Sequence, residues 1–173
     1  MKRRPLYRLT FIFVSSLCSF TKAQDATITR IPSVAIYTVD GLAANSGDFS
    51  NKGKPLVIDF WATWCRPCVM ELNAIADKYD YWQKQTGVKV IIVAVDSASP
   101  QSQKVAAFVR NRQWRYAVYL DPYGNLQNAM QVMDTPCTFV VNGNGKIVYM
   151  HNSYLPGDED KVFDVLEKLK QKK

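Results

Sequence analysis

The chain has 173 residues, of which 22 are Lys or Arg and 15 are Asp or Glu, so that its formal net charge is +7. A hydrophobic content of 47% with only 8 Gly and 8 Pro excludes a disordered or collagen-like protein, and the length suits one domain with a substantial core. The charge by itself suggests a nucleic-acid binder. Five of the basic residues, however, lie within residues 1–23, which contain no acid; the remainder carries 17 basic and 15 acidic side chains, a net charge of +2. We therefore expect no nucleic-acid partner.

Residues 1–23 have the layout of a secretory signal peptide. A basic stretch up to Arg8 precedes a mainly apolar run of 12 residues, Leu9 to Phe20, which is followed by Thr21, Lys22 and Ala23. Twelve helical residues rise only about 18 Å, less than the roughly 30 Å of a hydrocarbon core, so the run does not favour a transmembrane anchor. We predict cleavage after Ala23, a periplasmic or secreted location, and one mature domain over residues 24–173.

Cys18 allows one alternative, a lipoprotein whose lipidated cysteine begins the mature chain. Leu17 stands before it, where a lipoprotein signal has a small residue, so we interpret Cys18 as an apolar filler of the run. Export also bears on the other cysteines, because an oxidising compartment permits disulfides that the cytosol would reduce.

The elements of the mature chain follow from three kinds of pattern. Short apolar runs indicate strands, apolar residues at helical spacing indicate helices, and Gly, Pro, Asn and Asp mark the turns. In chain order we expect a strand hairpin starting at 34–39, a loop at 46–55, a buried strand at 56–61, a helix at about 67–85, a buried strand at 88–95, an amphipathic helix at 100–112, a strand at 117–120, a short helix at 126–132, paired strands at 138–141 and 146–150, and a helix from about 158. This order predicts an α/β fold with helices on both faces of a central mixed sheet and an N-terminal strand extension.

A Cys-x-x-Cys motif lies where the first buried strand gives way to a helix, in the segment WATWCRPC of residues 61–68. A zinc site would need two ligands besides Cys65 and Cys68, and Cys137 and His151 are the candidates, at irregular spacing. A structural disulfide would close a very small loop and stabilise little. A redox pair explains the position of the motif better than either alternative.

The start of a helix is a favourable place for a reactive cysteine. Free backbone N–H groups and the positive end of the helix dipole favour the thiolate of Cys65, and Arg66 adds a nearby positive charge. Pro67 fits the first turn, where a backbone N–H has no helical partner. Cys68, one turn further along, is expected to be more shielded. We therefore predict that Cys65 attacks a substrate disulfide and that Cys68 resolves the mixed disulfide.

The chain resembles the thioredoxin superfamily, and in particular its exported TlpA/ResA-like branch, over roughly residues 34–169. The likeness rests on the WATWCRPC motif, the Thr135-Pro136 dipeptide before a strand hairpin, the exported N-terminus and the region from 88 to 113. It implies a thioredoxin fold in which the peptide bond before Pro136 is cis and lies against the redox cysteines, with Thr135 as a backbone contact for substrate. The substrate-binding residues that we expect are Trp64, Arg66, Pro67, Thr135 and Pro136.

Two acids add to this site. Asp59 lies six residues before Cys65 on the expected buried strand, and the resemblance gives it the position of the proton-transferring aspartate of ordinary thioredoxins. Many exported TlpA-like proteins carry a neutral residue there, so the chain combines two patterns. Glu71 lies three residues after Cys68, on the same helix face, and matches an acid that ResA-like proteins hold beside their active site. The alternatives are a polar strand-edge residue for Asp59 and a solvated helix residue for Glu71.

Cys137 departs from the family, which usually has a residue other than cysteine after the cis-proline. The simpler interpretation is a buried, hydrophobe-like cysteine without a function of its own. The alternative is that Cys137 reaches the active-site pair and forms a regulatory disulfide. We interpret His151 as a surface residue, because nothing in the chain pairs it with a nucleophile.

These patterns predict an extracytoplasmic thiol-disulfide oxidoreductase that uses no cofactor or metal, with Cys65, Cys68, Asp59 and Glu71 as its catalytic residues. The resemblance implies a reductase of protein disulfides, including those of apocytochrome c, that draws electrons from a membrane thiol transporter. We expect the protein to be a monomer. Two alternatives remain. One is a disulfide oxidase or isomerase that uses the same pair, and the other is a non-catalytic binding module of the same fold.

Overall fold

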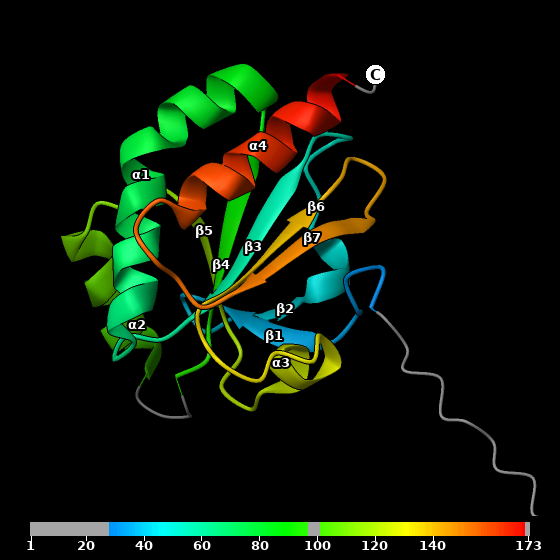
Figure 1. Cartoon of the computed structure of the whole chain (residues 1–173). Helices are drawn as coiled ribbons and strands as arrows, with labels where there is room; N and C mark the ends of the chain where they lie inside the picture. Colours follow the sequence, from blue (N-terminus) through cyan, green and yellow to red (C-terminus); the bar gives the residue numbers. More distant parts are fainter. Residues whose placement is uncertain (1–27, 97–100, 172–173) are drawn as a thin grey trace, which may run out of the picture.

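The computed structural model describes residues 28–96 and 101–171, and its strands form a single sheet. The strands are β1 (Ala35–Thr38), β2 (Ala43–Asn45), β3 (Leu56–Trp61), β4 (Lys89–Ala94), β5 (Ala117–Leu120), β6 (Cys137–Val141) and β7 (Ile147–Asn152). Their order in the sheet is β2-β1-β5-β4-β3-β6-β7 (Figure 1). β3, β4 and β5 run parallel, whereas the pairs at both ends of the sheet are antiparallel. The sheet is therefore mixed, and β1 and β2 form the predicted N-terminal extension.

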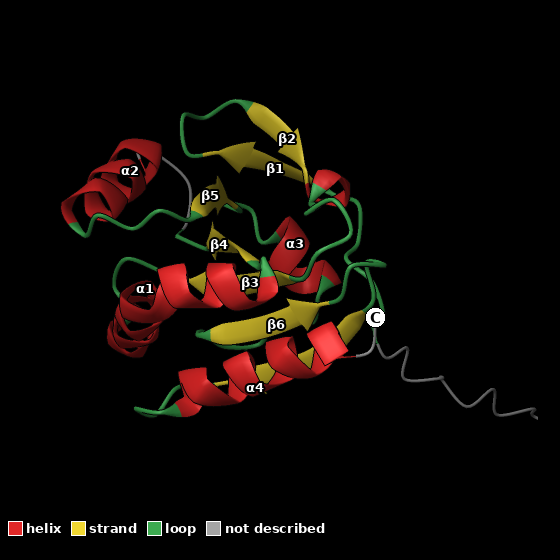
Figure 2. Ribbon diagram, turned by 90° about the horizontal axis from the view of Figure 1, so that it is seen from above, coloured by secondary structure: helices red, strands yellow, loops and turns green. Residues whose placement is uncertain are grey.

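Helices cover both faces of this sheet, as the element order predicts. The described helices are α1 (Arg66–Thr86), α2 (Gln101–Asn111), α3 (Asn125–Ala129) and α4 (Asp158–Gln171). α1 and α4 lie side by side over one face (Figures 1 and 2), and α2 adds Val105 and Val109 to the same hydrophobic cluster. α3 contributes Leu126 to a second cluster on the opposite face.

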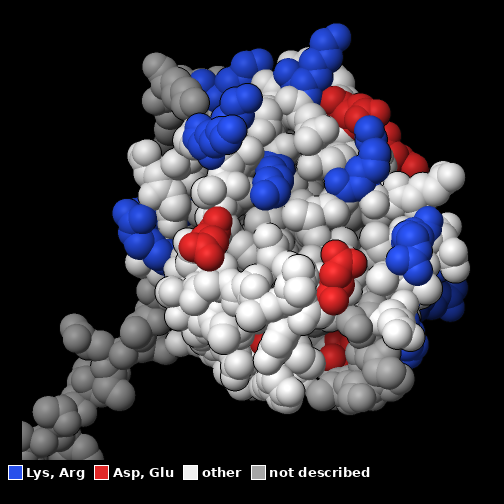
Figure 3. All heavy atoms as spheres, turned by 180° about the vertical axis from the view of Figure 1, so that it is seen from behind, with Lys and Arg blue, Asp and Glu red and all other residues white. Residues whose placement is uncertain are grey.

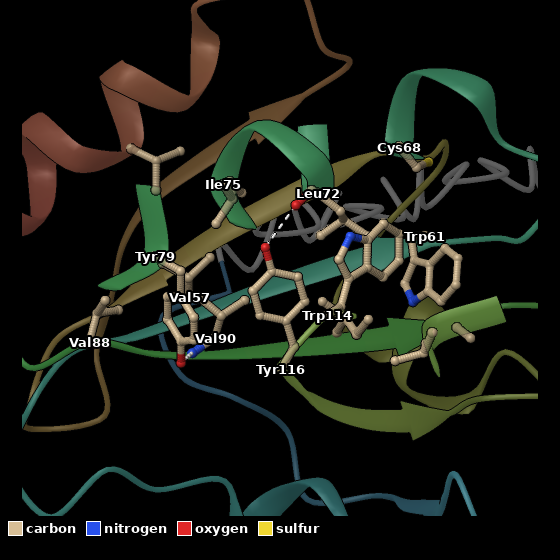
Figure 4. Packing of buried hydrophobic residues seen from close by; sticks show 14 of the residues in the cluster. Val57, Trp61, Cys68, Leu72, Ile75, Tyr79, Val88, Val90, Trp114 and Tyr116 are labelled. Atoms are coloured by element: carbon tan, nitrogen blue, oxygen red, sulfur yellow. Dashed lines mark hydrogen bonds between the residues drawn. The ribbon is translucent and has the colours of Figure 1, made fainter. Parts of the chain in front are cut away.

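β3 serves both clusters because successive side chains of a strand point to opposite faces. Val57 and Trp61 pack under α1, where Figure 4 shows them with Cys68, while Ile58 and Phe60 pack on the other side. All six residues of β3 are buried. This double burial explains why the strand is a nearly continuous apolar run. The same alternation directs the side chain of Asp59, which lies between Ile58 and Phe60, to the α1 side.

Two expectations about local structure are corrected. The helix expected at 126–132 spans Asn125–Ala129, because the chain leaves the helical region at Met130 and Gln131 has a positive φ of 54°. The expected loop at 46–55 begins with a 3-10 turn, Ser46–Asp48, whose first N–H groups need a cap. The side chain of Asn45 supplies it by accepting a hydrogen bond from the backbone N–H of Gly47.

The predicted signal peptide and its cleavage site lie outside the described residues. Within residues 28–96 and 101–171, no helix combines the length and the hydropathy of a membrane span.

Candidate active site

The two cysteines of the motif lie at the end of β3 and the start of α1, and a disulfide joins them. Cys65 is the N-cap residue of α1, and its Sγ accepts a hydrogen bond from the backbone N–H of Cys68 at 3.3 Å. Cys65 retains 5% of its surface exposed, whereas Cys68 is fully buried. The predicted difference between an accessible and a shielded cysteine is therefore present, although the exposure of Cys65 is small.

The turn that leads into α1 is fixed by Asp96, a residue that follows the neighbouring strand β4. One carboxylate oxygen of Asp96 accepts from the backbone N–H of Thr63 at 2.9 Å, and the other accepts from the Thr63 hydroxyl at 2.5 Å. Asp96 is 4% exposed. This contact could not be foreseen from the sequence, because an acid after one strand gives no sign of the turn residue that it meets after another.

Replacing Asp96 by alanine is expected to lower the free energy of unfolding of the oxidised protein by about 2 kcal/mol, because hydrogen bonds to a charged group contribute about 1.5–3 kcal/mol each and Thr63 is half-buried. Urea denaturation measures the change. The control is Asp134→Ala, since Asp134 is exposed. An Asp96→Ala curve that coincides with that of the control would show that the contact does not stabilise the turn.

The loop before β6 places a cis-proline against the redox pair. The Thr135-Pro136 peptide bond is cis, as the resemblance implies, and Pro136 is buried. The carbonyl oxygen of Thr135 lies 3.7 Å from the Sγ of Cys65. The carbonyl oxygen of Pro136 accepts from the backbone N–H of Ser153 at 2.9 Å, which ties this loop to the segment after β7.

Two large apolar side chains are exposed close to Cys65. Trp64 is 70% exposed and Met133 is 86% exposed, and both line a shallow pocket with Thr135. Arg66 and Pro67 are exposed on the first turn of α1. The structure therefore brings most of the expected substrate-binding residues to the surface beside Cys65, with Pro136 buried among them. Met133 is a further member that the sequence analysis missed, because a single methionine in a loop carries no pattern.

The two predicted acids come together behind the cysteines. Asp59 on β3 and Thr138 on β6 are directly paired across the antiparallel strands. The Thr138 Oγ1 lies 2.9 Å from Asp59 Oδ2 and 2.7 Å from Glu71 Oε1. Cys68 and Glu71 are three residues apart on α1, so they share one helix face. Asp59 is fully buried and Glu71 is 1% exposed, so neither is a strand-edge or solvated residue.

Burial raises the pKa of both acids. The pKa of Asp59 lies well above its usual value, because of desolvation first and the charge of Glu71 second. Desolvation also raises the pKa of Glu71 to about 7, with smaller contributions from the charges of Asp158 and Glu159. The hydrogen bond to Thr138 opposes both shifts. Burial therefore favours the protonated form of both carboxyl groups, and Glu71 can exchange its proton near neutral pH.

Cys137 faces away from this site. Its neighbour Thr138 points to Asp59 and Glu71, and alternate residues of a strand point to opposite faces, so Cys137 lies in the cluster on the other face of the sheet. It is 1% exposed, and burial raises the pKa of its thiol to about 12. This placement favours the interpretation of Cys137 as a buried, hydrophobe-like residue over a regulatory disulfide with Cys65 or Cys68.

His151 is closer to the site than the sequence suggested. It pairs across the strands with Thr138, its side chain is 21% exposed, and its Nε2 lies 3.2 Å from a carboxylate oxygen of Asp158 at the start of α4.

The charged side chains are dispersed over the surface. On the face drawn in Figure 3, the basic side chains of the described residues do not form one continuous patch, and acidic side chains lie between some of them.

Comparison with known proteins identifies relatives of the same architecture. Residues 22–150 match the AhpC/TSA family. The thiol-disulfide oxidoreductase ResA of Bacillus subtilis is 33% identical over 132 residues, which cover 75% of this chain and 66% of ResA. ResA of Bacillus thuringiensis is 27% identical, over 85% of this chain and 87% of its own length. A thioredoxin-like protein of Porphyromonas gingivalis, solved in solution, is 39% identical with a TM-score of 0.72, over 80% of this chain and 90% of that one.

The family match, over residues 22–150, includes the strand-to-helix turn that carries the two cysteines and nearly all of the sheet behind it. The disulfide between Cys65 and Cys68 accounts for the chemistry that the names of the ResA relatives state. The chain belongs to the AhpC/TSA family and is a thioredoxin-fold, ResA-type thiol-disulfide oxidoreductase.

Proposed function

We propose that the protein is an exported reductase of protein disulfides, with Cys65 as the attacking and Cys68 as the resolving cysteine. The observation that carries the direction of the reaction is the pair of buried acids behind Cys68. A carboxylate that accepts the proton of Cys68 speeds the step in which Cys68 attacks, and reduction of a substrate ends with that step.

The reaction balances with the groups in place. The Cys65 thiolate attacks one sulfur of the substrate disulfide, and the other substrate sulfur leaves as a thiolate that takes up a proton. Cys68 then transfers its proton to a carboxylate and attacks the Sγ of Cys65, which releases the second substrate thiolate. Two electrons have passed to the substrate, and the cysteines are joined as the structure shows them. A membrane thiol transporter is the donor that returns the two electrons.

The surface around Cys65 supports a polypeptide substrate. Trp64 and Met133 are exposed and line one pocket with Thr135, and tryptophan is a residue type that protein-binding surfaces favour. Thr135 is half-buried with its carbonyl oxygen next to Cys65, and we expect its backbone to hydrogen-bond an extended segment. An unfolded chain with exposed cysteines fits such a site better than a folded one, and apocytochrome c is the substrate that the resemblance suggests.

Export rests on the sequence of residues 1–23, with its basic start and its apolar run. The match to the family begins at residue 22, so nearly all of this segment precedes the matched domain. We therefore assign residues 24–173 as the mature domain, located in the periplasm or outside the cell.

The reduction potential tests the direction. Negative charge near Cys68 disfavours a second thiolate there, and a destabilised reduced form makes the pair a better reductant, so we expect a potential of about −220 mV or lower. The measurement equilibrates the protein with glutathione buffers of known ratio and counts free thiols by alkylation and mass spectrometry. A value between about −120 and −180 mV is typical of oxidases and isomerases and would reject the reductase. Asp59→Asn removes one of the two buried acids and should raise the potential, whereas Asp164→Asn, the same change on the exposed surface of α4, should leave it unchanged.

A further inference from the structure

Three elements contribute one residue each to a closed polar contact inside the apolar core. Asp59 comes from β3, Glu71 from α1 and Thr138 from β6. All three are at most 1% exposed, and the single hydroxyl of Thr138 lies at hydrogen-bond distance from both carboxyl groups, at 2.9 Å and 2.7 Å. The exchange chemistry described above has no part for Thr138.

A threonine hydroxyl has one proton to donate and lone pairs to accept with. If both carboxyl groups were ionised, Thr138 could donate to only one of them, and the other contact would bring two unprotonated oxygens together. If one carboxyl group keeps its proton, that group donates to Thr138 and Thr138 donates to the other, so both contacts are satisfied. The second oxygens, Asp59 Oδ1 and Glu71 Oε2, are buried without a hydrogen-bond partner among the described residues, so no other donor supports double ionisation.

We propose that Thr138 is a positioning residue that joins Asp59 and Glu71 into one unit, which holds one proton at neutral pH and presents one carboxylate as the base for Cys68. When Cys68 gives up its proton, the unit holds two protons, and Thr138 can still donate to one carboxyl group and accept from the other. The surplus proton leaves when the substrate thiolate is protonated. This inference goes beyond the proposed function, because it concerns where the proton of Cys68 goes. It holds whether the protein reduces or oxidises its substrate.

The surroundings favour a neutral or singly charged unit. The titratable groups that face it from the packed elements are Tyr116 just before β5, Tyr149 and His151 on β7, Tyr154 in the following loop, and Asp158 and Glu159 on α4. Cys137, next to Thr138 on β6, lies on the other face of the sheet. The two acids of α4 add negative charge and are themselves paired, Asp158 with Lys161 and Glu159 with Lys78. Within residues 28–96 and 101–171, neither Asp59 nor Glu71 forms an ion pair with a basic side chain.

Thr138→Val and Thr138→Ser separate the hydroxyl from the shape of the side chain. Carboxyl carbons of Asp59 and Glu71 are followed by NMR during a pH titration of the disulfide form, which needs no substrate. In the native protein we expect two ionisation steps more than one pH unit apart, with one proton retained at pH 7. Thr138→Val removes a hydrogen bond that favours the charged form, so the first step should move up by about one unit. Thr138→Ser keeps the hydroxyl group and should return the first ionisation step to its native pH.

The same variants should differ in the resolving step. The reduced protein releases one thionitrobenzoate from a chromogenic aryl disulfide when Cys65 attacks and a second when Cys68 resolves. At a pH below the first ionisation step of the unit, Thr138→Val should slow the second release of thionitrobenzoate about tenfold, because a pKa raised by one unit lowers the ionised fraction of the base tenfold. The first release, which depends on Cys65, should be unchanged. The matched control is Thr86→Val, which also removes a threonine hydrogen bond, to the carbonyl of Trp82.

Two results would overturn the proposal. One is a native protein in which both carboxyl groups lose their protons below pH 5, and this outcome needs no variant to fold. The other is a Thr138→Val titration that coincides with the native one. Either result would leave the reduction potential, and with it the proposed direction, to be decided separately.

Discussion

Replacing Cys68 by serine is expected to stop the protein at a mixed disulfide between Cys65 and its substrate, with turnover reduced by at least about a thousandfold. Cys68 is the sulfur bonded to Cys65 in the structure, and it lies one helical turn further along α1. Without it, the mixed disulfide can be released only by an external thiol, which must reach a Cys65 that is 5% exposed. Expression of the variant in its own cell, followed by non-reducing electrophoresis and mass spectrometry, should yield covalent partners through Cys65.

Two further variants complete this experiment. Cys65→Ser should form no adduct and should also lose turnover, because the attacking thiolate is absent. Cys137→Ala is the control, and turnover should stay within about twofold of the native value, because Cys137 lies in the cluster on the other face of the sheet. Retention of the cellular role by Cys65→Ser would support the non-catalytic binding module instead. A Cys137 disulfide in any trapped species would contradict its placement.

The parts of the site that follow from local sequence could be predicted. The apolar run of β3, the Cys-x-x-Cys motif and the proline after the first cysteine together determine a strand, a turn and a helix start, and these place Cys65 at the N-cap. The cis bond before Pro136 needed the resemblance as well, because a threonine-proline pair alone is cis in about one case in twenty.

The contacts across strands could not be predicted in the same way. Thr138 is one polar residue in a short strand, and its meeting with Asp59 depends on the register between β3 and β6. The contact between Thr63 and Asp96 depends in the same way on β3 and β4 ending side by side. Sequence periodicity tells which face a residue occupies, but not which residue of another strand lies opposite.

The start of α4 illustrates a partial prediction. Acids in the first turn of a helix are favourable to its dipole, and Asp158 and Glu159 stand there. The structure adds partners that the dipole argument does not foresee: Tyr154 donates to Glu159 at 2.9 Å, and the backbone N–H of Leu155 donates to Asp158 at 2.8 Å. These bonds hold the start of α4 to the loop before it, and they keep two negative charges near Glu71.

The raised pKa of Glu71 makes the stability of the oxidised protein fall as the pH rises. An unfolded glutamate releases its proton near pH 4.5, whereas Glu71 in the folded protein releases it near pH 7. Between these values the folded state binds more protons than the unfolded state, so this group's contribution to stability is complete below about pH 4.5 and is lost by about pH 7. A shift of this size corresponds to about 3 kcal/mol. Asp59, whose pKa is also raised, acts in the same direction.

Glu71→Gln is therefore expected to flatten the stability profile. Glutamine imitates the protonated acid in shape and charge and can accept the hydrogen bond of Thr138. At pH 8 the variant should be more stable than the native protein by about 3 kcal/mol in urea denaturation, and near pH 4.5 the two should be equal within about 1 kcal/mol. Glu167→Gln, the same change on the exposed surface of α4, should leave the native profile unchanged.

The opposite contribution of Asp158 does not interfere with this comparison. Its hydrogen bonds, above all that from Lys161, lower its pKa to about 2, so the stability that it provides is lost only as the pH falls below about 3.8. If the Glu71→Gln and native profiles ran parallel from pH 4.5 to 8, the pKa of Glu71 would be the same in the folded and the unfolded protein, and burial would not raise it. A gain in stability together with a slower resolving step would show that the protein keeps a destabilising acid for its chemistry.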